Sequence, residues 1–223
     1  MKKSLLRATA LLLSTLTLIL SVAPLVSCGF SDEEEAEFLS IAREQITLSE
    51  TLNEIYFGAG IPHDPDHKGV GVYYYADEEY LKDAGFSNIK ELKDLTATVF
   101  SEEYCNIIYQ SAFEGVNDEN FIVYARYSNS ETLSDTSADR TAQILVNTSY
   151  EPYDGMLAYE REYDLDSIEI TKVRKHSVTV KIKVTYSVRE GYTDQGKLAG
   201  SREREIIFTR PESGGYRINT PTY

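Results

Sequence analysis

The chain has 223 residues, with 22 Lys and Arg against 36 Asp and Glu, which gives a formal net charge of −14. An apolar fraction of 42% is sufficient for a hydrophobic core, so the composition excludes global disorder and fits one domain of ordinary size. The acidic balance argues against a nucleic-acid partner, because contacts with phosphate require Lys and Arg.

The N-terminal segment has the pattern of an export signal. Three basic residues lie within the first seven positions, and no charged residue follows until Asp32. Residues 10–20 are mostly Leu. A basic start followed by an apolar stretch is typical of a secretory signal peptide.

The end of this segment, Leu25-Val26-Ser27-Cys28, resembles the lipobox of bacterial lipoproteins. The resemblance implies that Cys28 carries a diacylglyceryl group, becomes the first mature residue and holds the protein on the extracytoplasmic face of the cell membrane. The chain would then comprise a signal peptide (1–27), the lipidated Cys with a short tether (28–32) and a single domain (33–223). An uncleaved membrane anchor is the alternative, because the uncharged stretch is just long enough to span a bilayer.

Cleavage would alter the net charge, and lipidation would leave one free cysteine. It would remove three basic residues and no acidic residue, so the net charge would become −17. A domain of this charge would be held at the membrane by its acyl chains, since two chains give stable anchoring. With Cys28 modified, Cys105 is left without a partner cysteine, and no intramolecular disulfide is expected.

Helices are expected in the first half of the domain. Ser31 and Glu34 match the capping-box pattern, and apolar residues at helical spacing predict a long helix over residues 33–57. Gly58, Gly60 and Pro62 end it. The further elements expected here are a loop over 58–69, a strand over 70–75, a helical turn over 77–84, a helix capped by Ser87 over 87–99 and a helix capped by Ser101 over 101–113.

Strands are expected from residue 120 onwards. Strict alternation of apolar and polar residues over 177–189 predicts a strand with one wet face. The other expected strands are 121–127, 142–150, 157–163, 168–174, 202–210 and 216–219. Helices followed by antiparallel strands predict an α+β domain. Its long N-terminal helix and short helices would pack on a curved, mainly antiparallel sheet.

Three resemblances concern this domain. The element order resembles the NTF2-like or cystatin-like cone, whose last strand carries an aromatic-Arg-aliphatic pattern, found here as Gly215-Tyr216-Arg217-Ile218. Tyr56-Phe57-Gly58-Ala59-Gly60-Ile61-Pro62, together with Tyr124-Ala125-Arg126-Tyr127, resembles a group of uncharacterised Gram-positive lipoproteins. The helix-then-sheet layout is also similar to secreted inhibitors of cell-wall endopeptidases. A likeness of fold implies no activity by itself.

The segment from His63 to His67 contains the best candidate metal ligands, which are His63, Asp64, Asp66 and His67. Imidazole and carboxylate groups are zinc ligands. Pro65, however, excludes the regular helix that would bring both histidines to one face. The alternative is a solvated turn, so we expect neither a tightly bound metal nor a cofactor.

No catalytic residue is expected. Cys105 lies within an expected helix and His176 at an expected hairpin turn, so nothing in the sequence brings them together as nucleophile and base. A free Cys in such a place is usually buried and inert. The sequence contains no Walker loop, nucleophile elbow, CxxC or HExxH motif.

Other carboxylates give weaker signals. Asp164 and Asp166 flank Leu165 in an expected turn. A second set of acids lacks the spacing of an EF-hand but could meet a calcium ion. It comprises Asp118, Glu119, Asp135 and Asp139.

Tyrosine is abundant, with 17 copies, and tryptophan is absent. Residues 73–75 are three consecutive tyrosines that alternate across an expected strand, so at least one of them should face solvent or a cleft. We take Tyr73 and Tyr75 as candidate binding residues, because tyrosine is enriched at recognition surfaces. Ordinary sheet propensity is the alternative explanation.

These observations favour a membrane-anchored, extracytoplasmic, non-enzymatic binding module. Its expected partner is a protein with a basic surface near the membrane. One alternative is an envelope enzyme or metal-dependent hydrolase that uses the segment from His63 to His67. Another is an inhibitor of cell-wall hydrolases, with an acidic face that complements a basic partner.

Overall fold

The computed structural model describes residues 30–114, 117–118, 121–122, 125–129, 143–150, 158–194, 197–212 and 214–222. Helices and two four-stranded antiparallel sheets make up this part of the chain, which confirms the predicted α+β class. The expected signal peptide and the lipidation candidate Cys28 lie outside the described residues, as do the acids Glu119, Asp135 and Asp139.

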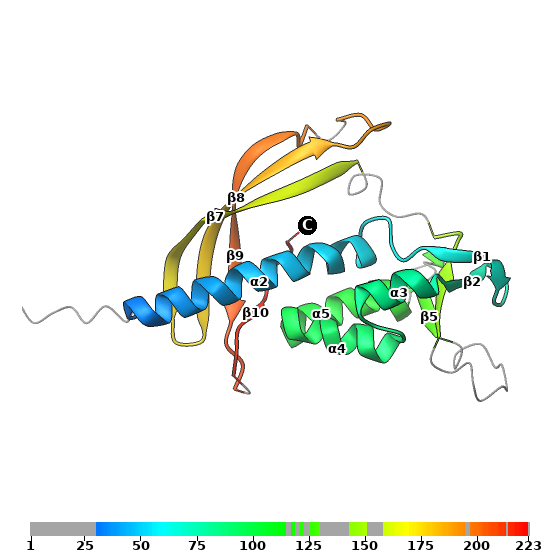
Figure 1. The fold of residues 1–223 in the computed structure, drawn as a ribbon, viewed down its shortest axis with the longest axis horizontal. Helices are drawn as coiled ribbons and strands as arrows, with labels where there is room; N and C mark the ends of the chain where they lie inside the picture. The colour runs from blue at the N-terminus through cyan, green and yellow to red at the C-terminus, as the bar shows by residue number, and fades with distance from the viewer. Residues whose placement is uncertain are drawn as a thin grey trace, which may run out of the picture.

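The longest helix, α2 (Asp32–Tyr56), begins with the predicted capping box. The Ser31 hydroxyl accepts a hydrogen bond from the Glu34 amide at 3.3 Å, and the Glu34 carboxylate accepts one from the Ser31 amide at 2.8 Å. Four acidic residues occupy the first turn, where the helix dipole favours negative charge. Figure 1 shows α2 running between the C-terminal sheet on one side and three short helices on the other.

The C-terminal sheet has the strand order β10-β9-β8-β7. It consists of β7 (Tyr159–Arg174), β8 (Ser177–Val188), β9 (Gly200–Thr209) and β10 (Arg217–Ile218). The predicted alternation of β8 is confirmed, because Val178, Val180, Ile182 and Val184 are all buried. Phe38 of α2 packs against this sheet, with its ring 5.4 Å from Phe208 and 4.8 Å from Tyr216.

One expectation about this sheet is wrong. Residues 159–174 form a single long strand, β7, rather than two strands separated by a turn at Asp164 and Asp166. A register shift between Asp164 and Glu169 takes up the extra residues. Within it, the Ser167 hydroxyl accepts a hydrogen bond from the Lys183 amide at 2.9 Å, so β7 bends and remains paired with β8.

The second sheet has the order β1-β2-β6-β5, so the expected single curved sheet is two sheets. Its strands are β1 (His63–Lys68), β2 (Tyr73–Ala76), β5 (Tyr127–Asn129) and β6 (Ile144–Asn147). The expected loop over 58–69 is therefore partly wrong, because β1 lies within it and pairs with β2. A small hairpin of β3 (Asn117–Asp118) and β4 (Phe121–Ile122) precedes β5.

The short helices are α3 (Glu78–Ala84), α4 (Ile89–Val99) and α5 (Glu102–Tyr109). Gly85 ends α3 and Ser101 caps α5, as the sequence predicts. The cap of α4 is Asn88 rather than Ser87. A π-helical turn, η1 (Gln110–Glu114), continues α5. A hydrogen bond of 2.8 Å between the hydroxyls of Tyr56 and Thr96 joins α2 to α4.

Two segments far apart in the sequence, residues 56–62 and 125–127, meet in space. Arg126 is buried, and its guanidinium donates to the carbonyls of Tyr56 at 3.0 Å and Gly58 at 2.6 Å, at the C-terminal end of α2. The Tyr127 hydroxyl donates to the Ile55 carbonyl at 2.6 Å and accepts from the Ile61 amide at 3.0 Å. The pair therefore satisfies backbone groups that the helix end leaves unpaired and fixes α2 to the second sheet.

Candidate binding pocket

A half-open pocket of about 810 Å³ lies where the second sheet meets the start of α4. Strands β1, β2 and β6 contribute walls, and α3, the turn that follows it and the first turn of α4 contribute the rest. Its lining comprises Asp64, His67, Tyr75, Ala76, Glu78, Leu81, Lys82, Gly85, Phe86, Ser87, Glu91, Gln143 and Ile144.

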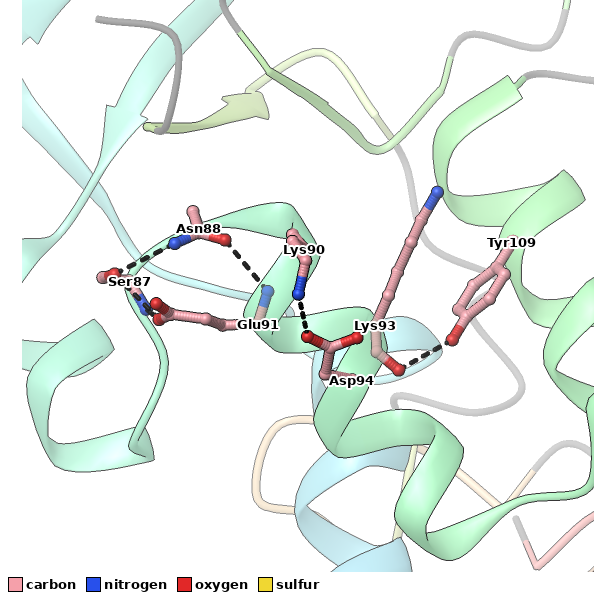
Figure 2. A network of polar contacts seen from close by, with 7 residues as sticks. All are labelled: Ser87, Asn88, Lys90, Glu91, Lys93, Asp94 and Tyr109. Carbon is pink, nitrogen blue, oxygen red and sulfur yellow. Dashed lines mark hydrogen bonds and ion pairs between the residues drawn. The ribbon is translucent and has the colours of Figure 1, made fainter. Parts of the chain in front are cut away.

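The side chain of Glu91, which lines this pocket, is fixed in position by hydrogen bonds. It accepts hydrogen bonds from the Ser87 amide at 2.7 Å and the Ser87 hydroxyl at 2.8 Å, as Figure 2 shows. The Asn88 side chain in turn accepts from the Glu91 amide at 2.9 Å. The hydrogen bonds from Ser87 lower the pKa of Glu91, so its carboxylate is charged at neutral pH.

Asp64 is held in a similar way. It accepts from the Asp66 amide at 2.9 Å, and its other oxygen lies 2.7 Å from Nδ1 of His67. The Asp66 hydrogen bond is the main cause that lowers the pKa of Asp64, and the His67 contact adds to it. Asp64 is therefore a second fixed negative charge at the pocket.

The pocket combines negative charge with an apolar wall. Three carboxylates line it, from Asp64, Glu78 and Glu91, and Lys82 is the one lysine among the lining residues. Buried Leu81, Phe86 and Ile144 supply hydrocarbon surface, and Tyr75 adds an aromatic ring. This combination suits a ligand that has a cationic head and an aliphatic body.

The sequence candidates divide into two groups. Asp64, His67 and Tyr75 line the pocket, whereas His63, Asp66 and Tyr73 do not. The His67 ring contacts Tyr75 and the His63 ring contacts Tyr74, with centroid distances of 6.4 and 5.3 Å. Consecutive strand residues point to opposite faces, so the two histidines lie on opposite faces of the sheet. The register shift between His63 and Lys68 produces this separation.

The other chemical candidates also lie apart. Cys105 is buried in α5, which confirms its predicted burial, and burial raises the pKa of its thiol. His176 lies exposed in the turn between β7 and β8, and no hydrogen bond joins it to Cys105 in the described part of the chain. Within the described ranges, no three His, Cys, Asp or Glu residues are grouped as metal ligands would be.

The sequence analysis missed Glu78, Lys82 and Glu91. The available signal was local: Glu91 follows Ser87 by four residues at a helix start, and Glu78 follows the N-cap Asp77. These positions indicate the beginnings of two helices. They do not indicate that both helix beginnings and a sheet enclose one pocket.

Comparison of the chain with models of known protein families, with curated proteins and with solved structures gave no match. None of the helices in the described ranges combines the length and the apolar character needed to cross a membrane.

Proposed function

We propose that the protein is a non-enzymatic binding module in which this pocket receives a basic side chain from a protein partner. The observation that carries the proposal is the set of three carboxylates, with a single lysine, around an apolar wall. A Lys or Arg stem would pack on Leu81 and Phe86, and its head would meet Glu78 and Glu91. Because Ser87 already holds Glu91, little side-chain entropy is lost on binding.

The whole-chain charge supports the same partner. A formal net charge of −14, or −17 after removal of residues 1–27, attracts basic protein surfaces and repels anionic lipids and wall polymers. A cell-wall hydrolase with a basic surface is one partner of this kind, which would make the protein an inhibitor.

A defined peptide tests the pocket directly. We would titrate the chain with a short neutral-ended peptide containing one Lys, and with the same peptide containing norleucine, which keeps the stem and lacks the charge. The Lys peptide should bind more tightly, and Glu78→Gln/Glu91→Gln should remove the difference. Glu205→Gln, an exposed acid on β9, is the control that should retain it. Equal binding of both peptides to the unmodified chain would contradict the proposal.

Capture from envelope extract at low and high salt then tests the class of partner. Basic proteins should be captured less as salt rises, because attraction between exposed charges is screened over about 8 Å at physiological ionic strength. Salt-insensitive binding to purified wall polymer, with no protein captured, would show that the partner class is wrong.

We also propose that the protein is a lipoprotein anchored through Cys28. Phe30 packs 5.5 Å from Phe38, so the domain begins two residues after the lipidation candidate. At about 3.5 Å per extended residue, the lipid would hold the start of α2 within roughly 10 Å of the membrane surface.

Intact-mass analysis of protein extracted from membranes tests the anchor. We expect a mature chain that begins at a lipid-modified Cys28, and an unprocessed precursor when Cys28→Ser is introduced. An unmodified Cys28 would contradict this expectation.

Finally, we propose that α2 and the C-terminal sheet form an NTF2-like or cystatin-like cone, to which the second sheet is an addition. The packing of Phe38 on Phe208 and Tyr216, beside the Tyr216-Arg217-Ile218 pattern, supports this assignment. An experimental structure compared with both fold groups would test it.

A further inference from the structure

A second cavity, of about 510 Å³, lies between the C-terminal half of α2 and the beginning of β7. It shares no lining residue with the pocket described above. Figure 1 shows the C-terminal sheet arching away from this part of α2. The lining comprises Glu50, Thr51, Asn53, Glu54, Glu160, Arg161, Tyr163, Arg189 and Thr222.

Two of the charged residues in this lining already form an ion pair with each other. Arg189 contacts Glu54 at 2.7 Å and so joins the end of β8 to α2. The remaining charged groups are Glu50, Glu160 and Arg161. The Arg161 side chain forms no hydrogen bond and no ion pair with another residue that the structure describes, whereas its backbone pairs with β8.

Glu50 and Arg161 influence each other across the cavity without touching. Burial raises the pKa of Glu50, and the positive charge of Arg161 acts in the opposite direction. Opposite charges held on two walls of one cavity can each pair with the matching end of a ligand placed between them.

A buried amide supplies an independent observation. Asn53 is 3% exposed, and its Nδ2 donates to the Thr222 hydroxyl at 2.8 Å. Its Oδ1 is buried and has no hydrogen-bond partner in the described part of the chain. An unsatisfied buried acceptor destabilises the fold, so a ligand that donates a hydrogen bond here would be favoured. The Tyr163 hydroxyl donates to the Thr222 carbonyl and holds this wall in place.

We propose that this cavity binds a small zwitterion, either a free amino acid or a short peptide, which has both an ammonium and a carboxylate group. Arg161 pairs with the carboxylate. Glu50 receives the ammonium group, and Asn53 Oδ1 accepts a further hydrogen bond. A ligand with a single charge would leave Arg161 or Glu50 desolvated and unpaired, which disfavours it.

Calorimetric titration of the full chain with four probes tests the proposal. The probes are alanine, dialanine, N-acetyl-dialanine, which lacks the ammonium group, and dialanine amide, which lacks the carboxylate. At least one zwitterion should bind saturably, and each blocked form should bind at least about tenfold more weakly than dialanine. Whichever of alanine and dialanine binds more tightly identifies the ligand as a free amino acid or a peptide.

Two variants test which residue pairs with each charged group of the ligand. Arg161→Gln should weaken dialanine until it binds no better than its amide, and Glu50→Gln should do the same relative to the N-acetyl form. Lys172→Gln, an exposed residue of β7 that lines neither cavity, is the control and should leave all four titrations unchanged. Thermal unfolding would establish that each variant is folded.

Three results would overturn the proposal. They are the absence of saturable binding of both alanine and dialanine, equal binding of dialanine and its blocked forms, and undiminished discrimination in folded Arg161→Gln. None of them bears on the lysine peptide of the first pocket, so the two proposals stand or fall separately.

Discussion

At the scale of single residues, Arg126 shows how a buried charge holds the structure together. Its guanidinium donates to two carbonyls at the C-terminal end of α2 and lies 4.9 Å from the Tyr150 ring centroid. The cation thus lies where the helix dipole is negative. Gly60 makes room for it, because a Cβ at residue 60 would lie 2.4 Å from Arg126 Nη2.

We predict that Gly60→Ala destabilises the protein more than Gly71→Ala. Both glycines have positive φ, of +86° and +65°, so each substitution incurs a backbone cost of about 1–2 kcal/mol. An added methyl group meets nothing within 4 Å at residue 71, whereas at residue 60 it adds an overpacking cost of about 1–3 kcal/mol. Denaturant unfolding measures the difference, and equal losses would show that the contact with Arg126 costs nothing.

A second prediction at this scale concerns Cys105. In a Cys28→Ser chain, where Cys105 is the single thiol, labelling by a thiol reagent should be slow in the folded state and fast in denaturant. The side chain is 4% exposed, and burial raises its pKa, so little accessible thiolate forms at neutral pH. Rapid labelling of the folded chain would instead indicate a reactive cysteine.

At the scale of elements, hydrogen bonds between residues close in the chain define where the helices begin. Features of the edge strands also hinder pairing with further strands. Ser31, Asp77, Asn88 and Ser101 each accept a hydrogen bond from an amide in the first turn of their helix. At one edge, β1 contains Pro65 and a register shift, and at another the long strand β7 carries many charges. Both features oppose pairing with a further strand.

The capping box of α2 gives a pH prediction. Hydrogen bonds from Ser31 lower the pKa of Glu34 from its ordinary value of 4.5. A carboxyl with a depressed folded pKa stabilises the fold above its unfolded pKa and loses that contribution as pH falls through the lower folded value. The melting temperature of the unmodified chain should therefore exceed that of Glu34→Gln at neutral pH, and the two should converge in acid.

Ser31→Ala is the companion variant. It removes the hydroxyl that accepts from the Glu34 amide and donates to the Glu34 carboxylate, and it should cost about 1 kcal/mol at neutral pH. A gap between the unmodified chain and Glu34→Gln that stays constant down to about pH 3 would contradict the role of the Glu34 charge.

At the scale of the whole molecule, α2 connects the two sheets. Its N-terminal half packs on the C-terminal sheet through Phe38, and its C-terminal end is held by Arg126 and Tyr127 beside β5. One continuous cluster of buried side chains includes residues from α2, from the short helices and from both sheets. Loss of packing on α2 should therefore affect the whole fold.

We predict that Phe38→Ala lowers the free energy of unfolding by about 3–5 kcal/mol, because it empties the space between Phe208 and Tyr216. Leu48→Ala, on the same helix but 37% exposed, should change it by only about 0.5 kcal/mol. Denaturant unfolding followed at both near- and far-ultraviolet wavelengths should show one transition. Two transitions would mean that the sheets unfold separately.

The sequence alone predicted the α+β class, the helix beginning at Ser31, the alternating strand β8 and the burial of Cys105. Each of these depends on interactions between residues close in the chain or on a regular apolar period. The tertiary structure decided what local pattern cannot encode. Strand pairing divided the strands between two sheets, and the register shift in β1 placed His63 and His67 on opposite faces. Both pockets likewise combine side chains far apart in sequence, such as Asp64 with Ile144 and Glu50 with Arg161, because only packing brings their elements together.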